Sequence, residues 1–165
     1  MVYASQMRQH VPIMAYNCKL YAVQKGLDLC KENPGDEANQ AKSFIIGEMD
    51  ELTAMKNAMG DYNKEEMKIT VENFVLSIFA AADKDERTCE KVGKAQAVAF
   101  KRAGDFITVM GVFGDLAPEW EEKRKYCVYK AGNIMQCLKK GEEPQRGNPF
   151  APEEEKNEVV ESEQP

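Results

Sequence analysis

The sequence predicts an all-α protein, with two tandem three-helix bundles followed by an acidic disordered tail. Three observations support this fold class. Apolar residues recur at helical spacings of three and four along nearly the whole body, and they alternate as in a strand almost nowhere. Breaks that contain proline, glycine or polar runs leave five clear helical segments and one possible short one, which makes two sets of three. The composition then changes at Glu142, where apolar residues become few and acidic residues dense.

The first bundle is expected over residues 1–60. Val2–Gln9 is a possible short first helix. Apolar residues in steps of three and four predict the second helix over Ile13–Leu29, and the stretch KENPGDEAN ends it because proline and glycine do not continue a helix. The same spacing predicts a third helix over Glu37–Met59, and Gly60 is placed to terminate it.

The second bundle is expected over residues 67–141, after a connection at 61–66. The apolar spacing predicts its helices over Met67–Asp83, Glu86–Phe113 and Pro118–Lys140. The polar stretch ADKDERT is interpreted as the first connection between them. GDLAPE is interpreted as the second, with a proline suited to a helix start. The glycine after Lys140 is placed to cap the last helix.

Residues 142–165 are expected to form an acidic tail or a linker. Four of the seven prolines fall in this segment. Of the 28 acidic and 22 basic residues in the chain, 8 and 2 lie here, which leaves 20 of each in the body. A protein that binds nucleic acid needs a basic surplus or a basic stripe. The balanced body therefore argues against a nucleic-acid partner.

We expect a cytoplasmic protein without a transmembrane segment or a metal or other cofactor. The opening residues, MVYASQMRQHVP, lack the basic flank and apolar core of a secretory signal. The best apolar stretch, Phe106–Phe113, is far shorter than the ~18 residues that a membrane span needs. The five cysteines are odd in number and form no CxxC pair, which indicates reduced, mostly buried thiols rather than a zinc site or a disulfide framework. They are Cys18, Cys30, Cys89, Cys127 and Cys137.

The sequence lacks the residue patterns that catalysis commonly uses. A catalytic triad would have to use His10, the single histidine, and no glycine-rich phosphate loop occurs. Adjacent acids such as Asp50 and Glu51 point about 100° apart on a helix and are typical of solvated faces. We therefore do not expect an enzyme. An enzyme with Cys89 or Cys127 as its nucleophile remains an alternative.

One predicted helix, Glu37–Met59, carries more apolar surface than a narrow seam needs. Three of the nine methionines lie on it, and methionine is over-used on surfaces that accept several partners. The surface is either a wide core face or an exposed groove for a partner helix. Asp50 is accordingly either a solvent-facing acid or the partner of a basic residue on that helix.

Four stretches of the chain closely resemble a known family. They are MAYNCKLYAVQKGLDL, ENFVLSIFAAADKDERT, FITVMGVFGDL and KRKYCVYKAGNIMQCLKKGEEPQRGNP. Together they resemble the N-terminal region of the VTA/LYST-interacting-protein family, in order, from about Pro12 to Pro149. The resemblance implies a tandem of MIT (microtubule interacting and trafficking) modules, each a three-helix bundle. It also implies that the protein acts as a cofactor of the AAA ATPase that disassembles ESCRT-III polymers on endosomes.

The resemblance further implies where partners bind. In such modules a short amphipathic helix from an ESCRT-III C-terminal tail lies between helices two and three. The stretch EMDELTAM is similar to the segment whose acid pairs with an arginine of that tail, and Asp50 occupies this position. The walls of the implied groove are Met49, Leu52, Lys56 and Met59 on one side and Tyr16, Lys19 and Val23 on the other.

The second module departs from this pattern. The position that corresponds to Asp50 is Ala131, so no acid is present for a ligand arginine and a tail must bind in another way. Candidate contact residues in this module are Trp120, Tyr126, Tyr129 and Met135.

These features lead to the hypothesis of a non-enzymatic adaptor in endosomal, multivesicular-body sorting. It would be peripheral at endosomal membranes, bind ESCRT-III tails and help couple them to the ATPase. The family dimerises and contacts the ATPase through a C-terminal helical domain. This chain ends after the acidic stretch, so it is either a fragment or a protein that lacks that domain. The alternative is a helical scaffold or self-association module that binds no such tail.

Overall fold

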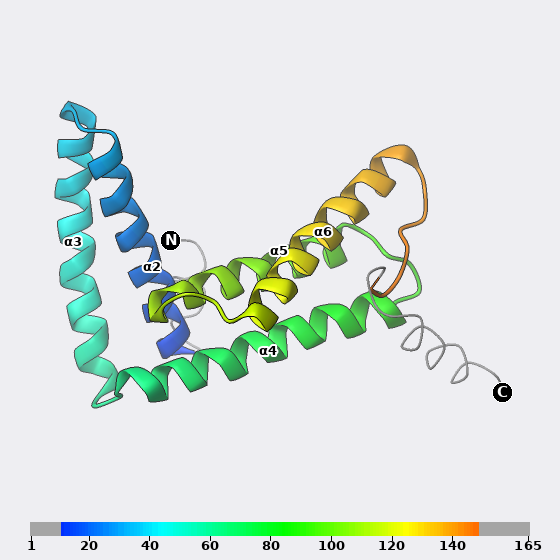
Figure 1. Ribbon diagram of the computed structural model, residues 1–165, viewed down its shortest axis with the longest axis horizontal. Helices are drawn as coiled ribbons and strands as arrows, with labels where there is room; N and C mark the ends of the chain where they lie inside the picture. Colours follow the sequence, from blue (N-terminus) through cyan, green and yellow to red (C-terminus); the bar gives the residue numbers. More distant parts are fainter. Residues whose placement is uncertain (1–10, 149–165) are drawn as a thin grey trace.

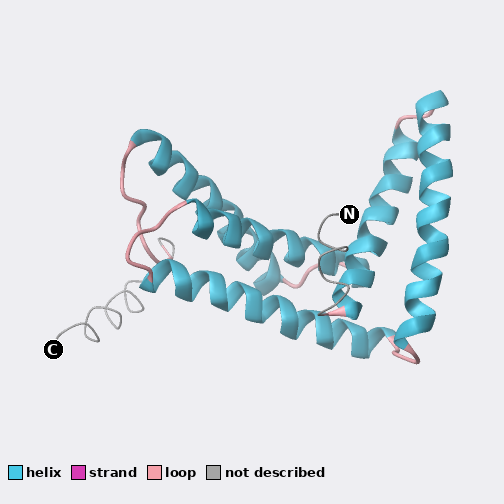
Figure 2. Cartoon of the chain, turned by 180° about the vertical axis from the view of Figure 1, so that it is seen from behind, coloured by secondary structure: helices cyan, strands magenta, loops and turns pink. Residues whose placement is uncertain are grey.

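The computed structural model describes residues 11–148, and within that range the chain is helical without a strand (Figures 1 and 2). This confirms the all-α class. The possible first helix, Val2–Gln9, and residues 149–165 of the expected tail lie outside the described residues. The elements are α2 (Pro12–Glu32), α3 (Asp36–Met59), α4 (Lys64–Thr88), α5 (Lys94–Val109), the 3-10 turn η1 (Met110–Phe113) and α6 (Pro118–Lys140).

The boundary between α4 and α5 differs from the prediction. The polar stretch ADKDERT is not a connection, because α4 continues through it to Thr88 and α5 begins only at Lys94. The stretch contains neither glycine nor proline, and Arg87 pairs with Asp83 one turn before it at 2.7 Å, which supports a helix. The connection between the two helices lies instead just before Lys94. There the N–H of Gly93 donates to the side chain of Gln96, in the first turn of α5.

The turns at the other helix ends follow the sequence signals. Gly60 and Gly141 adopt positive φ values of 83° and 74°, which residues with a Cβ rarely tolerate. Gly141 is the left-handed C-cap of α6, as predicted. Asn63 begins α4 with a reciprocal capping box to Glu66.

Helices α2 and α3 form an antiparallel hairpin that stands away from the rest of the molecule (Figure 1). Within the described residues, α2 is the only helix whose backbone lies close to that of α3, and Met59 at the end of α3 also packs against the main core. A small apolar cluster holds the two together, and its buried members are Val23, Cys30, Ala38, Ile45 and Leu52. Few apolar residues therefore hold α2 and α3 together, and much of the surface of α3 is exposed to solvent.

The main core lies among α4, α5, η1 and α6, with α5 buried most completely. Phe100, Phe106 and Ile107 of α5 are at most 1% exposed. Helices α5 and α6 approach closely because Gly104 lacks a side chain, and a Cβ there would lie 3.2 Å from that of Cys127. The first turns of α2 join the same core through Ile13, Met14 and Cys18. Helix α2 thus belongs to both clusters, and the division into bundles at residues 61–66 stays a prediction.

The chain does not leave the body at the end of α6. Residues 142–148, which we call the strap, run back from α6 to the C-terminal end of α4 (Figure 1). Pro144 and Gly147 are buried in this segment. The structure therefore differs from the expected boundary, because the described part of the acidic segment packs onto the second helical unit. No helix between residues 11 and 148 has the length and apolarity that would let it cross a membrane.

Candidate functional site

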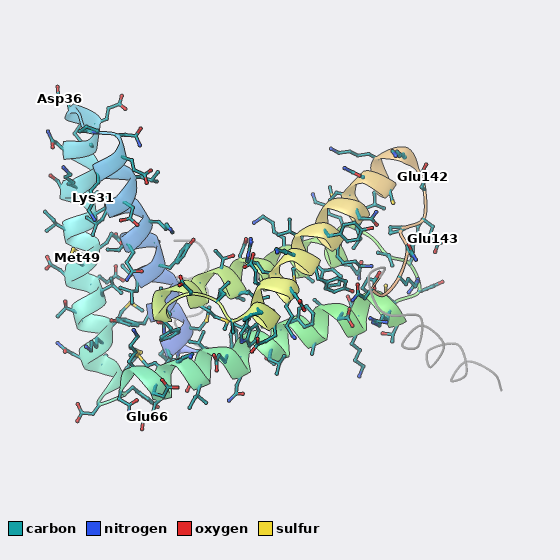
Figure 3. All side chains as sticks on the ribbon, viewed as in Figure 1. Lys31, Asp36, Met49, Glu66, Glu142 and Glu143 are labelled. Atoms are coloured by element: carbon teal, nitrogen blue, oxygen red, sulfur yellow. The ribbon has the colours of Figure 1, made fainter. Side chains whose placement is uncertain are left out.

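The structure places Met49, Asp50 and Lys56 together on the exposed face of α3. All three side chains are exposed, and Met49 retains 45% of its accessible surface (Figure 3). At about 100° per residue, Met49 and Lys56 lie 40–60° to one side of the buried Leu52, and Asp50 lies about 160° from it. Ile46, which is 60% exposed, falls on the same side. We call Ile46, Met49, Asp50 and Lys56 the outer stripe of α3.

Leu52 and Val23 do not line an open surface. Both belong to the buried cluster between α2 and α3, with 7% and 4% of their surface exposed. Tyr16 is half-buried and packs against this cluster and against the main core. These three residues support the hairpin from beneath and present little area to a partner.

Lys19 is engaged within the chain. Its side chain is 3% exposed, and its Nζ lies 2.7 Å from Glu48 and also bonds to Glu51. Both acids are on α3, so the ion pairs tie the two helices of the hairpin together. Sequence reasoning missed this because the partners are about 30 residues away. The sequence feature that indicates such a partner is the pair of acids one turn apart on the same helix, Glu48 and Glu51.

Met59 lies apart from the outer stripe. It lines a hollow of about 500 Å³ at the foot of the hairpin, where α3 ends and α2 begins. The other lining residues are Pro12, Ile13, Met55, Ala58 and Tyr62. Met59 is therefore not brought together with Met49 and Asp50.

A second hollow, of about 570 Å³, lies along the hairpin on the side opposite Met49. Small residues on both helices create it, including Ala22 and Gly26 on α2 and Ala41 on α3. Phe44 stands at its rim and is 63% exposed. In the sequence, the small residues Ala22 and Gly26 at a spacing of four indicate such a hollow. The prediction did not use them.

The four candidate partner-binding residues in the second expected bundle, residues 67–141, do not form one site. Trp120 is half-buried and lines a small hollow of about 80 Å³ between α4 and α6. The Tyr126 hydroxyl donates to Asp83 at 2.7 Å, and burial raises the pKa of this phenol above its ordinary value. Met135 is half-buried against the main core, whereas Tyr129 is 38% exposed. Three of these residues therefore support the packing of α6, and Tyr129 lies outside it.

The environment of the thiols does not favour nucleophilic chemistry. Burial raises the pKa of Cys127 to about 12 and that of Cys18 to about 11, whereas an attacking thiolate requires a lowered pKa. Within residues 11–148 no three histidine, cysteine or acidic side chains are grouped as metal ligands would be.

Native alkylation should follow this burial. With iodoacetamide at pH 8, we expect the half-buried Cys89 and Cys137 to react at least about tenfold faster than Cys18 and Cys127, which stay protonated and covered. Peptide mapping by mass spectrometry measures these rates. Rapid, selective labelling of Cys127 would contradict the assignment.

The same thiols make stability depend on pH. Because their raised pKa values favour the neutral thiols in the fold, their contribution to the free energy of unfolding is complete below pH 9 and is lost as the pH rises towards 11–12.

Comparisons with known proteins identify the family of the chain. The sequence pattern of the family described as Vta1 like matches residues 1–140. The mouse and human proteins named vacuolar protein sorting-associated protein VTA1 homolog are 37% and 36% identical over 156 residues, which cover 92% of this chain and 48% of each relative.

A plant relative extends the match. The Arabidopsis thaliana protein named homolog of mammalian LYST-interacting protein 5 is 31% identical over 146 residues, covering 88% of this chain and 33% of the relative. The chain spans about half the length of the mammalian relatives. Because the family pattern matches residues 1–140, which are most of the sequence, the chain belongs to the Vta1-like family.

Proposed function

We propose that this chain is a non-enzymatic adaptor of vacuolar protein sorting that binds helical tails of other proteins on its α2–α3 hairpin. The mouse and human relatives carry vacuolar protein sorting in their names. The structural observation that carries the proposal is the position of α3. In the described residues only the backbone of α2 lies close to that of α3, and α3 leaves large apolar side chains, among them Ile46 and Met49, exposed to solvent.

The outer stripe of α3 has the chemistry of a surface for an amphipathic helix. Ile46 and Met49 offer apolar contact at a spacing of one turn. Asp50 is exposed beside them and is able to accept from an arginine or a lysine of the ligand. The partner class that follows from the family resemblance is the C-terminal tail of an ESCRT-III subunit. Coupling of these tails to the AAA disassembly ATPase at endosomal membranes is the wider role that we propose.

Asp50→Ala should weaken tail binding and leave the melting temperature unchanged. The lost ion pair costs about 1–3 kcal/mol if the ligand covers it and much less at a wet rim, so we expect a several-fold rise in Kd. Fluorescence anisotropy with labelled C-terminal tails of each ESCRT-III subunit measures the effect, with affinities on the order of micromolar for one short helix.

Two matched variants make this test specific. Asp28→Ala removes the same charge from the face of α2 that points away from α3, and it should leave binding unchanged. Phe44→Ala alters the hollow on the opposite side of the hairpin, so a larger loss with this variant would move the proposed surface there. Unchanged affinity of a folded Asp50→Ala chain would exclude the role of Asp50.

A helical scaffold or self-association module is the alternative function, because the same exposed apolar residues are suited to contact between two copies. Gel filtration with light scattering separates the two proposals. A monomer that binds tails supports the adaptor. A concentration-dependent dimer that binds no tail supports the scaffold.

A further inference from the structure

Helices α4 and α6 are held apart, and the strap joins them at one end. No Cα atom of α4 lies within 8 Å of a Cα atom of α6, although the structure describes both helices completely. Their connection is made by side chains instead. The Tyr126 hydroxyl reaches Asp83, and Lys130 reaches Glu86 at 2.6 Å. A polar hollow of about 430 Å³ lies between the two helices, and Asn148 at the end of the strap lines it. We call this space between α4 and α6 the α4–α6 cleft.

The strap is bound in this cleft largely through its backbone. The Lys130 ammonium, at 1% exposure, donates to the carbonyl oxygens of Gln145 at 2.7 Å and Gly147 at 3.1 Å. The Gly147 N–H donates to the second carboxylate oxygen of Glu86 at 3.0 Å. A buried base thus binds two carbonyls, and a buried acid binds one amide, of the same short segment, as they would bind a peptide ligand.

Arg146 adds the main side-chain contact. Its guanidinium donates to the carbonyl oxygens at the C-terminal end of α4, where a helix leaves its last carbonyls unpaired. The acceptors are Glu86 at 3.1 Å, Arg87 at 3.2 Å, Cys89 at 2.6 Å and Glu90 at 3.1 Å. Three of these carbonyls share the two hydrogens of one guanidinium nitrogen, and the Glu90 carbonyl accepts from the other, so one arginine side chain caps the end of α4.

The next position favours glycine. Gly147 has a φ of 71°, which residues with a Cβ rarely adopt, and a Cβ there would also displace the flexible end of Arg87, whose guanidinium nitrogen would lie 2.8 Å away. Beyond this point the cleft stays open, as a polar hollow of about 430 Å³ whose wall is completed by Asn148 at the end of the strap. Glu142 and Glu143, at the start of the strap, face solvent (Figure 3).

We propose that the strap is an intramolecular occupant of the α4–α6 cleft, which closes this cleft to other extended peptides. The site recognises a buried proline, an arginine that caps α4 and a glycine whose amide meets Glu86. An incoming peptide of this chemistry binds only after the strap has left. This inference concerns a different face of the molecule from the outer stripe of α3, so it does not depend on tail binding there.

A peptide that copies the strap tests the proposal in trans. The probe is the unlabelled peptide GEEPQRGNPF, titrated into the ¹⁵N-labelled full chain and followed by amide chemical shifts. The unchanged chain should show no shifts at Glu86 and Cys89. The variant Arg146→Ala/Gly147→Val, whose own strap loses its arginine contacts and its glycine with a positive φ, should show saturable shifts there. The same peptide with alanine in place of its arginine should bind at least tenfold more weakly.

Circular dichroism, amide exchange and a control variant show whether the strap has detached from a chain that is still folded. The double variant must retain the helical circular dichroism of the unchanged chain, and its residue 147 amide should exchange at least tenfold faster. Gln145→Ala is the matched control, because its side chain is exposed and only its carbonyl is used. Shifts in the unchanged chain, or none in a folded variant with a detached strap, would overturn the proposal. If the variant does not fold, rapid exchange of the Gly147 amide in the unchanged chain would overturn it, and slow exchange would support it.

Discussion

Lys130→Met is expected to lower the free energy of unfolding by about 3–5 kcal/mol, the usual cost of removing one partner from a buried ion pair. Glu86 is fully buried, and after the change its carboxylate loses its ammonium partner and keeps the hydrogen bond from the Gly147 N–H. The carbonyls of Gln145 and Gly147 lose their donor at the same time. Urea denaturation measures the effect as a lower midpoint with an unchanged slope.

A second substitution separates the charge from the packing. In Lys130→Met/Glu86→Leu no buried charge is left alone, so we expect this chain to recover a large part of the lost stability. Lys125→Met, on the exposed face of the same helix, should change stability by no more than about 0.5 kcal/mol. A loss below about 1 kcal/mol for Lys130→Met would contradict the assignment of a buried ion pair between Lys130 and Glu86.

Phe106→Ala should destabilise the chain by about 3–5 kcal/mol, because it removes a large side chain from a site that cannot easily collapse. Phe106 is 1% exposed and meets the ring of Phe74 edge to face, with centroids 5.6 Å apart. Its cluster also contains Met14 of α2, which is fully buried. Loss of the ring should therefore loosen the hairpin as well as the second unit.

Two probes test this coupling. Trp120, the single tryptophan, packs against the main core and reports on the second unit, whereas circular dichroism at 222 nm reports on all helices. Because α2 belongs to both apolar clusters, we expect both signals to move together at one lower midpoint. Val98→Ala, at a 45% exposed position of α5, is the matched control. Separate midpoints would show that the two units unfold independently.

The helices were predictable where apolar residues follow the helical period and a glycine or proline marks the end. Gly141 and the breaks after α2 and α3 are examples. The prediction failed between α4 and α5 because it took a run of charges as a loop. Side chains such as Asp83 and Arg87 pair along a helix and stabilise it, and polarity alone does not end a helix.

The candidate site was predictable only in part, for a related reason. Helical spacing places Met49 and Lys56 on one side of α3, and the structure shows both exposed there. Periodicity says nothing about partners on other helices, so it did not reveal that Lys19 is held by Glu48 and Glu51. It also did not reveal that Lys130 and Glu86, 44 positions apart, bind the strap.

Helix α4 sets a distance between the two ends of the molecule. Its 25 residues give a rigid rod of about 38 Å, with the hairpin at its start and the strap at its end. Two ligand motifs on one partner chain, one for each end, would need at least about 12 extended residues between them. A flexible Gly/Ser-type linker spans that distance on average at about 50 residues, where the local concentration of the second motif is greatest. Linker length alone would therefore decide whether one partner chain occupies both ends or two separate chains do.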